Sequence, residues 1–141
     1  MNTLVEIKDL SIGFQSQDRF NNVVHSISFN IPRGKTIAIV GESGSGKTVT
    51  ALSILKLLPY PSAFHESGKI IFDNKNLLSL NENEMQHVRG KNITAIFQEP
   101  MTSLNPLHTV EKQINEIIML HSSTTYNQAT KKQSVCSNKL V

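Results

Sequence analysis

The sequence predicts an α/β fold with an antiparallel β subdomain at its N-terminal end, and three observations lead to this prediction. Apolar and polar residues alternate near the N-terminus, as they do in half-buried strands. A short apolar run at residues 37–40 then leads directly into a glycine-rich segment. Beyond that segment, apolar residues recur at helical spacing. A strand, a glycine-rich turn and a helix therefore follow one another in a chain of 141 residues.

The antiparallel subdomain is expected within residues 1–31. Alternation is loose over residues 4–10 and clear over residues 25–31, so each segment predicts a strand. After a turn, residues 35–40 predict a strand whose run at 37–40 is apolar on both faces, which is typical of a central parallel strand. The helical spacing that begins near Lys47 continues until Pro59 and Pro61, because proline ends a helix.

Shorter elements are expected in the rest of the chain. Residues 68–72 and 92–97 predict strands, and residues 81–88 predict a polar helix capped by Asn81. A loop at residues 98–106 precedes an expected helix at residues 110–121. The predicted domain therefore covers residues 1–121. Residues 122–141 are polar and basic without a clear period, so we expect a disordered or aberrant tail.

Composition and charge exclude several classes of protein. No apolar stretch approaches the roughly 20 residues that span a bilayer, and the start lacks a signal-peptide pattern, so we expect a cytosolic chain without direct membrane insertion. The single cysteine, Cys136, excludes an internal disulfide framework. Residues 1–121 contain eleven basic and eleven acidic residues, and the net charge of +3 therefore comes from the tail. No nucleic-acid partner is expected, because the basic residues do not cluster in the body of the protein.

Residues 41–48 carry the strongest chemical signal in the sequence. They fit G-x-x-x-x-G-K-[ST], the phosphate-binding loop, in which glycines let backbone N–H groups turn toward a triphosphate. Lys47 is expected to reach the β- and γ-phosphates, and the Thr48 hydroxyl to ligate Mg²⁺. The predicted nucleotide site comprises Gly41, Glu42, Ser43, Gly44, Ser45, Gly46, Lys47 and Thr48. The loop alone does not distinguish kinases, GTPases, helicases and transport ATPases.

A second segment narrows the choice among these enzymes. Read together with the loop, Ile-Phe-Gln-Glu-Pro-Met-Thr-Ser-Leu-Asn-Pro at residues 96–106 resembles the ATP-binding subunit of an ABC transporter. It is similar to the Q-loop of the peptide and nickel importers. Residues 53–61 and 104–108 are most similar to the Yej-type importers of microcin C and oligopeptides. The resemblance covers about residues 4–121.

This resemblance implies a fold, an activity and partners. The fold would be the N-terminal half of a P-loop ATP-binding domain, and its activity would be ATP hydrolysis coupled to peptide import, with ATP and Mg²⁺ as cofactors. The implied partners are transmembrane permease subunits and a second ATP-binding domain, at the cytoplasmic face of the inner membrane.

The resemblance also implies roles for two residues outside the loop. Gln98 would contact Mg²⁺ and the attacking water, so Lys47 and Gln98 are the expected catalytic residues, and Thr48 and Gln98 the expected metal contacts. Phe14 falls where the family places an aromatic residue that stacks on adenine. Phe20 is the competing candidate, and a core position for Phe14 is the structural alternative.

The sequence departs from the family in its later motifs. The Leu-Ser-Gly-Gly-Gln signature, the acidic strand with the Mg²⁺-binding Asp and catalytic Glu, and the switch His do not occur within the 141 residues. We therefore expect a truncated ATP-binding domain that is inactive in isolation. The alternatives are a non-catalytic nucleotide-binding remnant or pseudogene product and another P-loop enzyme such as a small kinase, which the loop at residues 98–106 disfavours.

Overall fold

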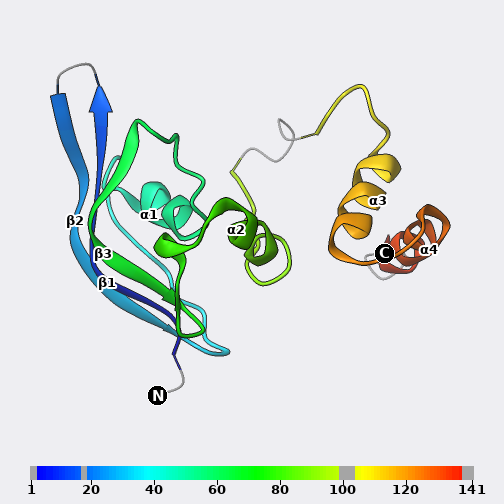
Figure 1. Ribbon diagram of the computed structural model, residues 1–141, viewed down its shortest axis with the longest axis horizontal. Coiled ribbons are helices and arrows are strands. Elements are labelled where there is room, and N and C mark those ends of the chain that lie inside the picture. The colour runs from blue at the N-terminus through cyan, green and yellow to red at the C-terminus, as the bar shows by residue number, and fades with distance from the viewer. Residues whose placement is uncertain (1–2, 17–18, 99–103, 138–141) are drawn as a thin grey trace. The chain divides into compact units, whose positions relative to one another are not determined.

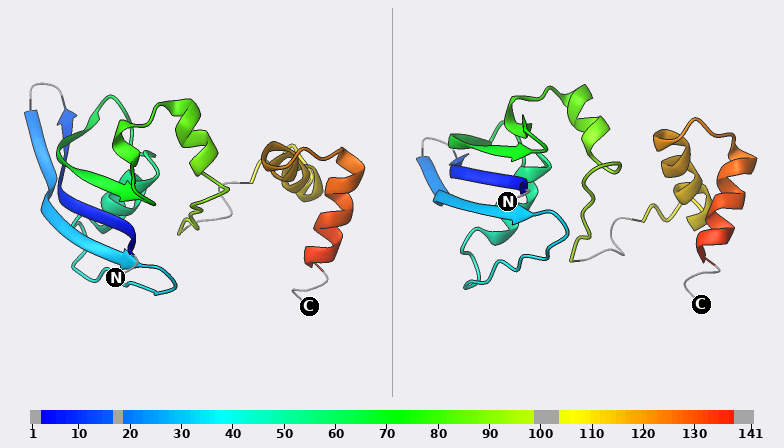
Figure 2. Two further views of the ribbon diagram at one scale, coloured as in Figure 1. Left: turned by 60° about the horizontal axis from the view of Figure 1, so that its bottom comes forward. Right: turned by 90° about the horizontal axis from the view of Figure 1, so that it is seen from below.

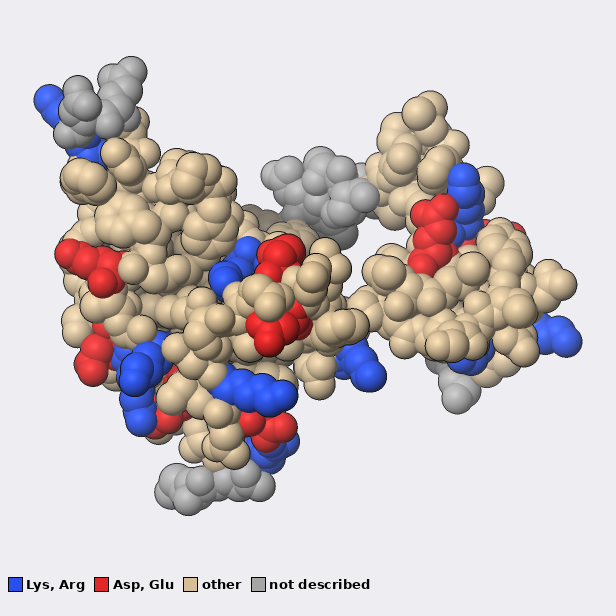
Figure 3. Space-filling view, viewed as in Figure 1, with Lys and Arg blue, Asp and Glu red and all other residues tan. Residues whose placement is uncertain are grey.

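The structure, a computed structural model, describes residues 3–16, 19–98 and 104–137, with side chains described through residue 135. The chain forms two compact units, residues 1–89 and residues 90–141, which are drawn in Figures 1 and 2. No helix among the described residues is long and apolar enough to cross a bilayer. Acidic and basic side chains are interspersed on the visible face of the first unit (Figure 3).

A curved antiparallel sheet forms one side of the first unit. Its strands are β1 (Thr3–Ser16), β2 (Arg19–Pro32), β3 (Ala63–Phe72) and β4 (Lys75–Asn76), in the order β2-β1-β3-β4. The predicted antiparallel subdomain is therefore confirmed, and it is larger than expected because β3 joins the free edge of β1. Irregular register between Ile7 and Leu10 interrupts the β1–β2 ladder and bends the two long strands.

The core of the first unit lies between the sheet and three short helical segments. These are α1 (Lys47–Ile54), the 3₁₀ helix η1 (Leu77–Ser79) and α2 (Glu82–Val88). The apolar side chains that are less than 9% exposed come from both layers: Val5, Ile7, Leu10, Ile12, Val24, Leu55, Leu58, Ala63, Ile70, Leu77 and Met85. Figure 1 shows α1 beside the sheet. The phosphate-binding loop thus precedes a helix that is followed closely by two buried apolar residues, Leu55 and Leu58.

Helix α2 begins as the sequence predicts. The Asn81 side chain accepts a hydrogen bond of 2.9 Å from the Glu84 backbone N–H, and the Glu84 carboxylate accepts one of 2.8 Å from the Asn81 N–H. This reciprocal capping box satisfies two N–H groups that would otherwise lack partners. The capping prediction is confirmed.

Two predicted strands are absent from the described structure. Residues 35–40 form no strand, and Ile37, Ile39 and Val40 are 46%, 46% and 90% exposed. Residues 92–97 also form no strand beyond a single bridge residue at Ile93, and Ile96 is 96% exposed. Both predictions were wrong because a strand needs a neighbour to pair with, and neither segment is part of the described sheet. An apolar sequence run alone does not provide that neighbour.

The second unit contains two paired helices, α3 (Val110–His121) and α4 (Tyr126–Ser137). The prediction of α3 is confirmed. The expected irregular tail differs from the structure, because α4 occupies most of it and buries Ala129 completely. The Asn115 side-chain amide donates a 2.8 Å hydrogen bond to the Thr130 hydroxyl and so joins α3 to α4. These contacts join α4 to α3, although the sequence of α4 shows no long apolar stripe. A domain boundary after residue 121 stays a prediction.

Candidate nucleotide-binding site

The loop between β2 and α1 turns sharply at two glycines. Gly44 and Gly46 have φ angles of +80° and +83°, and the Ser45 N–H donates a 3.2 Å hydrogen bond to the Glu42 carbonyl. Gly46 is the N-cap residue of α1 and provides no side-chain cap. The first N–H groups of α1 therefore have no partner within the helix, and they point toward the loop with the positive end of the helix dipole. This is the geometry of an anion site.

Lys47 folds back over the loop that precedes it. Its ammonium donates hydrogen bonds to the carbonyl oxygens of Gly41 at 2.8 Å and Glu42 at 2.6 Å, and to the Ser45 hydroxyl at 3.3 Å. The loop thus holds its cation above the helix N-terminus, where a phosphate oxygen would compete favourably with the neutral carbonyl acceptors.

Close packing against β2 fixes the position of the loop. A Cβ atom built on Gly46 would lie 2.9 Å from Cγ2 of Val24 and 3.0 Å from the carbonyl oxygen of Val23. Thr50 completes the first turn, since its N–H and hydroxyl both donate to the Gly46 carbonyl, at 2.8 and 2.9 Å. Residue 46 therefore needs to be glycine both for its φ angle and for the space available.

Two cavities adjoin the loop. The larger, of about 440 Å³, lies between the loop and β2, and the smaller, of about 220 Å³, follows the loop and the start of α1. The larger is lined by Val23, Val24, His25, Ile27, Phe29, Ile39, Val40, Gly41, Ser45, Lys47 and Thr50. The smaller is lined by Val23 and residues 44–49. The two cavities share Val23, Ser45 and Lys47, and the backbone N–H donors of the loop and of the start of α1 adjoin an apolar cavity lined by β2. This combination suits a ligand with an aromatic base and a charged tail.

The structure brings the predicted loop residues together, whereas the two aromatic candidates line neither cavity. Phe14 is half-buried in β1, where it pairs with Asn21 and Ala63, and it lines neither cavity. Phe20 is 71% exposed, and its ring contacts Phe64 edge to face at 5.7 Å. The proposed contact of Phe14 with adenine stays a prediction.

Gln98 is an exposed residue of the second unit, and its role at the nucleotide also stays a prediction. Residues 99–103 of the segment that resembles the Q-loop lie outside the described residues. Sequence reasoning missed Val23, which lines both cavities. The alternation predicted a strand only over residues 25–31, and it gave no signal for the contact of Val23 with the loop, which requires the tertiary fold.

The residues of the loop fit a nucleotide-bound Mg²⁺ better than an independent metal centre. Thr48 is exposed, and its hydroxyl has no hydrogen-bond partner within the described residues, so it is available as a hard oxygen ligand. The described residues contain no cluster of three or more His, Cys, Asp or Glu side chains that would hold a metal. Mg²⁺ commonly binds through one or two protein oxygens together with phosphates, and Thr48 suits that mode.

Comparison with known proteins identifies the family. The profile of the ABC transporter family matches residues 24–140, which is most of the chain. The chain belongs to the ABC transporter family. The resemblance found in the sequence is therefore confirmed, and the loop at residues 41–48 lies within the matched region.

Several curated ABC proteins are similar in sequence. The chain is 54% identical over 129 residues to the peptidoglycan transport ATP-binding protein YejF of Agrobacterium fabrum, covering 92% of this chain and 24% of that protein. It is 47% identical over 132 residues to the oligopeptide transport ATP-binding protein OppD of Bacillus subtilis, covering 94% of this chain and 37% of that protein. The chain thus spans about a quarter to two fifths of the length of these ABC relatives.

Solved structures confirm the fold class. The dimeric ATP-binding cassette MJ0796 in a post-hydrolysis state with ADP and Pi superposes with a TM-score of 0.76 at 20% sequence identity. The match covers 94% of this chain and 55% of the cassette chain. The two units therefore have the fold of part of an ABC cassette.

Proposed function

We propose that this chain is the ATP-binding part of an ABC ATPase that couples ATP hydrolysis to the import of peptides. The observation that carries this proposal is the Lys47 ammonium, held 2.8 and 2.6 Å from two loop carbonyls in front of an uncapped helix N-terminus. Such a site provides backbone donors and one mobile cation for a polyphosphate. Two relatives are named as peptidoglycan and oligopeptide transport ATP-binding proteins, and these names support peptides as the class of substrate.

Binding of ATP would use the two adjoining cavities together. The phosphates would accept hydrogen bonds from the N–H groups of the loop and the first turn of α1, while Lys47 would exchange its carbonyl acceptors for β- and γ-phosphate oxygens. Thr48 would ligate the Mg²⁺ that accompanies the nucleotide. The base would lie toward the apolar cavity beside Val23. Because Phe14 lines neither cavity, its stacking on the base is a separate prediction.

Hydrolysis needs more groups than this loop supplies. Water must be oriented for attack on the γ-phosphorus, and the resemblance gives that task to Gln98 together with a carboxylate and a signature loop. The sequence contains no Leu-Ser-Gly-Gly-Gln segment. We propose that those groups come from the rest of the cassette and from a second ATP-binding domain. The assembly would act with transmembrane permease subunits at the cytoplasmic face of the inner membrane.

A second candidate function is nucleotide binding without turnover. In this alternative Mg·ATP would bind at the loop without reaching the transition state for hydrolysis, which needs several further contacts. Both candidates require ATP to bind at the loop, and they differ in whether a complete transporter that contains this chain hydrolyses it.

Calorimetric titration of the full chain with Mg·ATP tests the shared requirement. Lys47→Ala should abolish measurable affinity with an unchanged circular dichroism spectrum, because only neutral donors would remain for the β- and γ-phosphates. Lys35→Ala is the matched control, since Lys35 is an exposed lysine outside the loop, and it should bind like the wild type. Equal affinity of a natively folded Lys47→Ala chain would show that the loop is not the site.

A further inference from the structure

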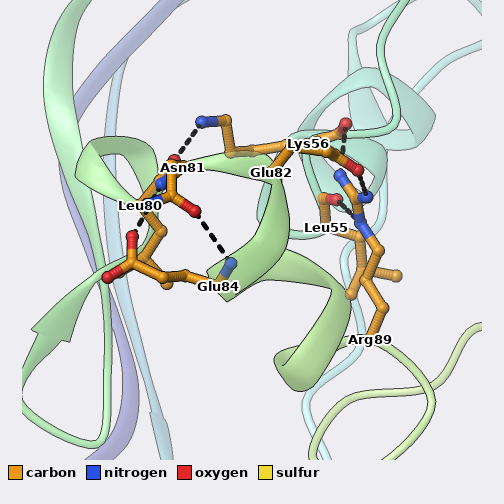
Figure 4. Close-up of polar contacts among 7 residues, drawn as sticks. All are labelled: Leu55, Lys56, Leu80, Asn81, Glu82, Glu84 and Arg89. Carbon is orange, nitrogen blue, oxygen red and sulfur yellow. Dashed lines mark hydrogen bonds and ion pairs between the residues drawn. The ribbon is translucent and has the colours of Figure 1, made fainter.

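The C-terminal end of α1 is held by a single guanidinium. Arg89 Nε donates a 2.7 Å hydrogen bond to the carbonyl oxygen of Leu55, and its Nη2 donates one of 3.0 Å to the carbonyl oxygen of Lys56 (Figure 4). Lys56 has a φ angle of +49°, which is unusual for a residue with a side chain. Arg89 thus donates hydrogen bonds to two carbonyl oxygens at this turn, where backbone N–H groups alone do not satisfy all the carbonyl acceptors.

The same guanidinium is tied to α2. Arg89 directly follows α2 and forms an ion pair through Nη1 with Glu82 in the first turn of that helix. In the opposite direction, the Lys56 ammonium donates to the carbonyl oxygens of Leu80 at 2.8 Å and Leu78 at 3.4 Å. Two cations therefore cross between the end of α1 and the segment around α2, as Figure 4 shows. The Arg89 side chain is 22% exposed and that of Glu82 is 64% exposed, so water competes less for the two carbonyl contacts than for the ion pair.

Physical chemistry explains why arginine suits this place. The last carbonyls of a helix carry partial negative charge, and a planar guanidinium can donate to two of them and to a carboxylate at once. Lysine keeps the charge but cannot reproduce this fork geometry. Since α1 has eight residues, its two ends are only about 12 Å apart at a rise of 1.5 Å per residue. A shift at the end bound by Arg89 therefore reaches the phosphate-binding end.

We propose that Arg89 is a positioning residue for nucleotide binding, which holds α1 against α2 so that the uncapped N-terminus of α1 stays in place for the phosphates. This proposal rests on the proposed function, because it assumes that ATP binds at the loop. Arg89 does not line either cavity at the loop, so its effect is indirect. By thermodynamic reciprocity, bound ATP should in turn strengthen the contacts that Arg89 makes.

Variants of Arg89 in the full chain test the positioning role. Arg89→Gln should weaken Mg·ATP binding roughly 5- to 150-fold, the usual range for coupled sites, and Arg89→Lys should fall between Arg89→Gln and the wild type. Glu82→Gln is the matched control, because it removes the ion pair but leaves both carbonyl contacts, and it should change affinity little. Unchanged affinity in a natively folded Arg89→Gln chain would overturn the proposal.

Hydrogen exchange measures a change on ATP binding that is not expected if Arg89 only stabilises the fold. In the wild type, saturating Mg·ATP should slow exchange of the amides of residues 55–57 and 82–89, with residues 3–8 of β1 as an unaffected reference. Arg89→Gln at saturating Mg·ATP should lose this distant protection and keep protection of residues 44–49. If Mg·ATP protects residues 44–49 alone in the wild type, the positioning role is refuted even where Arg89→Gln does not fold. If the wild type binds no ATP, the proposed function fails and the Arg89 role with it.

Discussion

Gly46 and Val24 are packed so closely that a Cβ atom on Gly46 would lie 2.9 Å from Cγ2 of Val24. Gly46 caps the helix that follows the phosphate-binding loop, and Val24 is a buried residue of β2 that also lines the larger cavity. This contact joins the loop to the sheet. The geometry of the anion site therefore depends on the antiparallel subdomain as well as on the loop sequence.

Gly46→Ala should therefore weaken ATP binding and lower the melting temperature. The added methyl group meets Val24 and the Val23 carbonyl, and the φ angle of +83° adds strain of roughly 1–2 kcal/mol. Gly44→Ala is the matched control, because its φ of +80° is similar but open space surrounds its Cβ position. Calorimetric titration and thermal unfolding of both variants separate the two effects. Identical losses in both would show that the contact with Val24 is unimportant.

Asn81→Ala should lower the free energy of unfolding by about 1 kcal/mol, the usual value of an N-cap side chain. The variant loses the 2.9 Å hydrogen bond from the Glu84 N–H and opens the capping box. Asn83→Ala lies two residues further along the same exposed turn and should be neutral or slightly stabilising, because alanine favours helices. Urea denaturation of the two variants measures the difference. A larger loss at residue 83 than at residue 81 would contradict the capping role.

The stability of the first unit should depend on pH through His65. Burial lowers the pKa of His65 below its usual value of 6.5, and the nearby Lys56 charge lowers it further. The folded state thus favours neutral His65, so the unfolded state binds more protons once the pH falls below 6.5. The free energy of unfolding should therefore fall as the pH drops through this value, until folded His65 is protonated as well.

Thermal unfolding between about pH 5 and pH 7 measures this contribution of His65. His65→Gln should flatten the dependence in this range, because it removes the group whose pKa burial lowers. An equally steep pH dependence in His65→Gln would assign the effect to other groups.

Phe14→Ala should weaken ATP binding by roughly 1–3 kcal/mol, the range for stacking of an aromatic side chain on a base. Phe14→Tyr should bind like the wild type, because stacking needs only the ring face. Tripolyphosphate is the control ligand, and its affinity should not change in either variant. An equal loss for tripolyphosphate and ATP would indicate that Phe14 supports the sheet, where it pairs with Asn21 and Ala63.

The 141-residue chain alone should not hydrolyse ATP, because Lys47, Thr48 and Gln98 supply only part of the groups needed for attack of water. We also expect it to associate or aggregate, since Ile39 and Val40 are 46% and 90% exposed. A phosphate-release assay together with size-exclusion chromatography measures both properties. Turnover that disappears in Lys47→Ala, from a soluble monomer, would contradict this expectation.

Much of the site followed from local sequence, because its geometry depends on neighbouring residues. The glycines at 44 and 46, with Lys47 after them, predict a turn with positive φ angles and a helix whose first N–H groups are free, and the structure has both. Asn81 likewise predicts the N-cap of α2, because its side chain accepts a hydrogen bond from the backbone N–H three residues later in the chain. Interactions between residues that are close in sequence can be predicted without knowing the rest of the fold.

Only the tertiary structure decided the features that depend on distant partners. Residues 35–40 have the composition of a strand but form none, since strand hydrogen bonds come from another segment. Helix α4 forms from a sequence without an apolar stripe, because Asn115 and Ala129 place it against α3. The carbonyl of Leu55 lies 34 positions from Arg89, which binds it. The spacing of apolar residues in the sequence does not predict such a contact, because the contact forms only when the chain folds back and brings the two groups into hydrogen-bonding range.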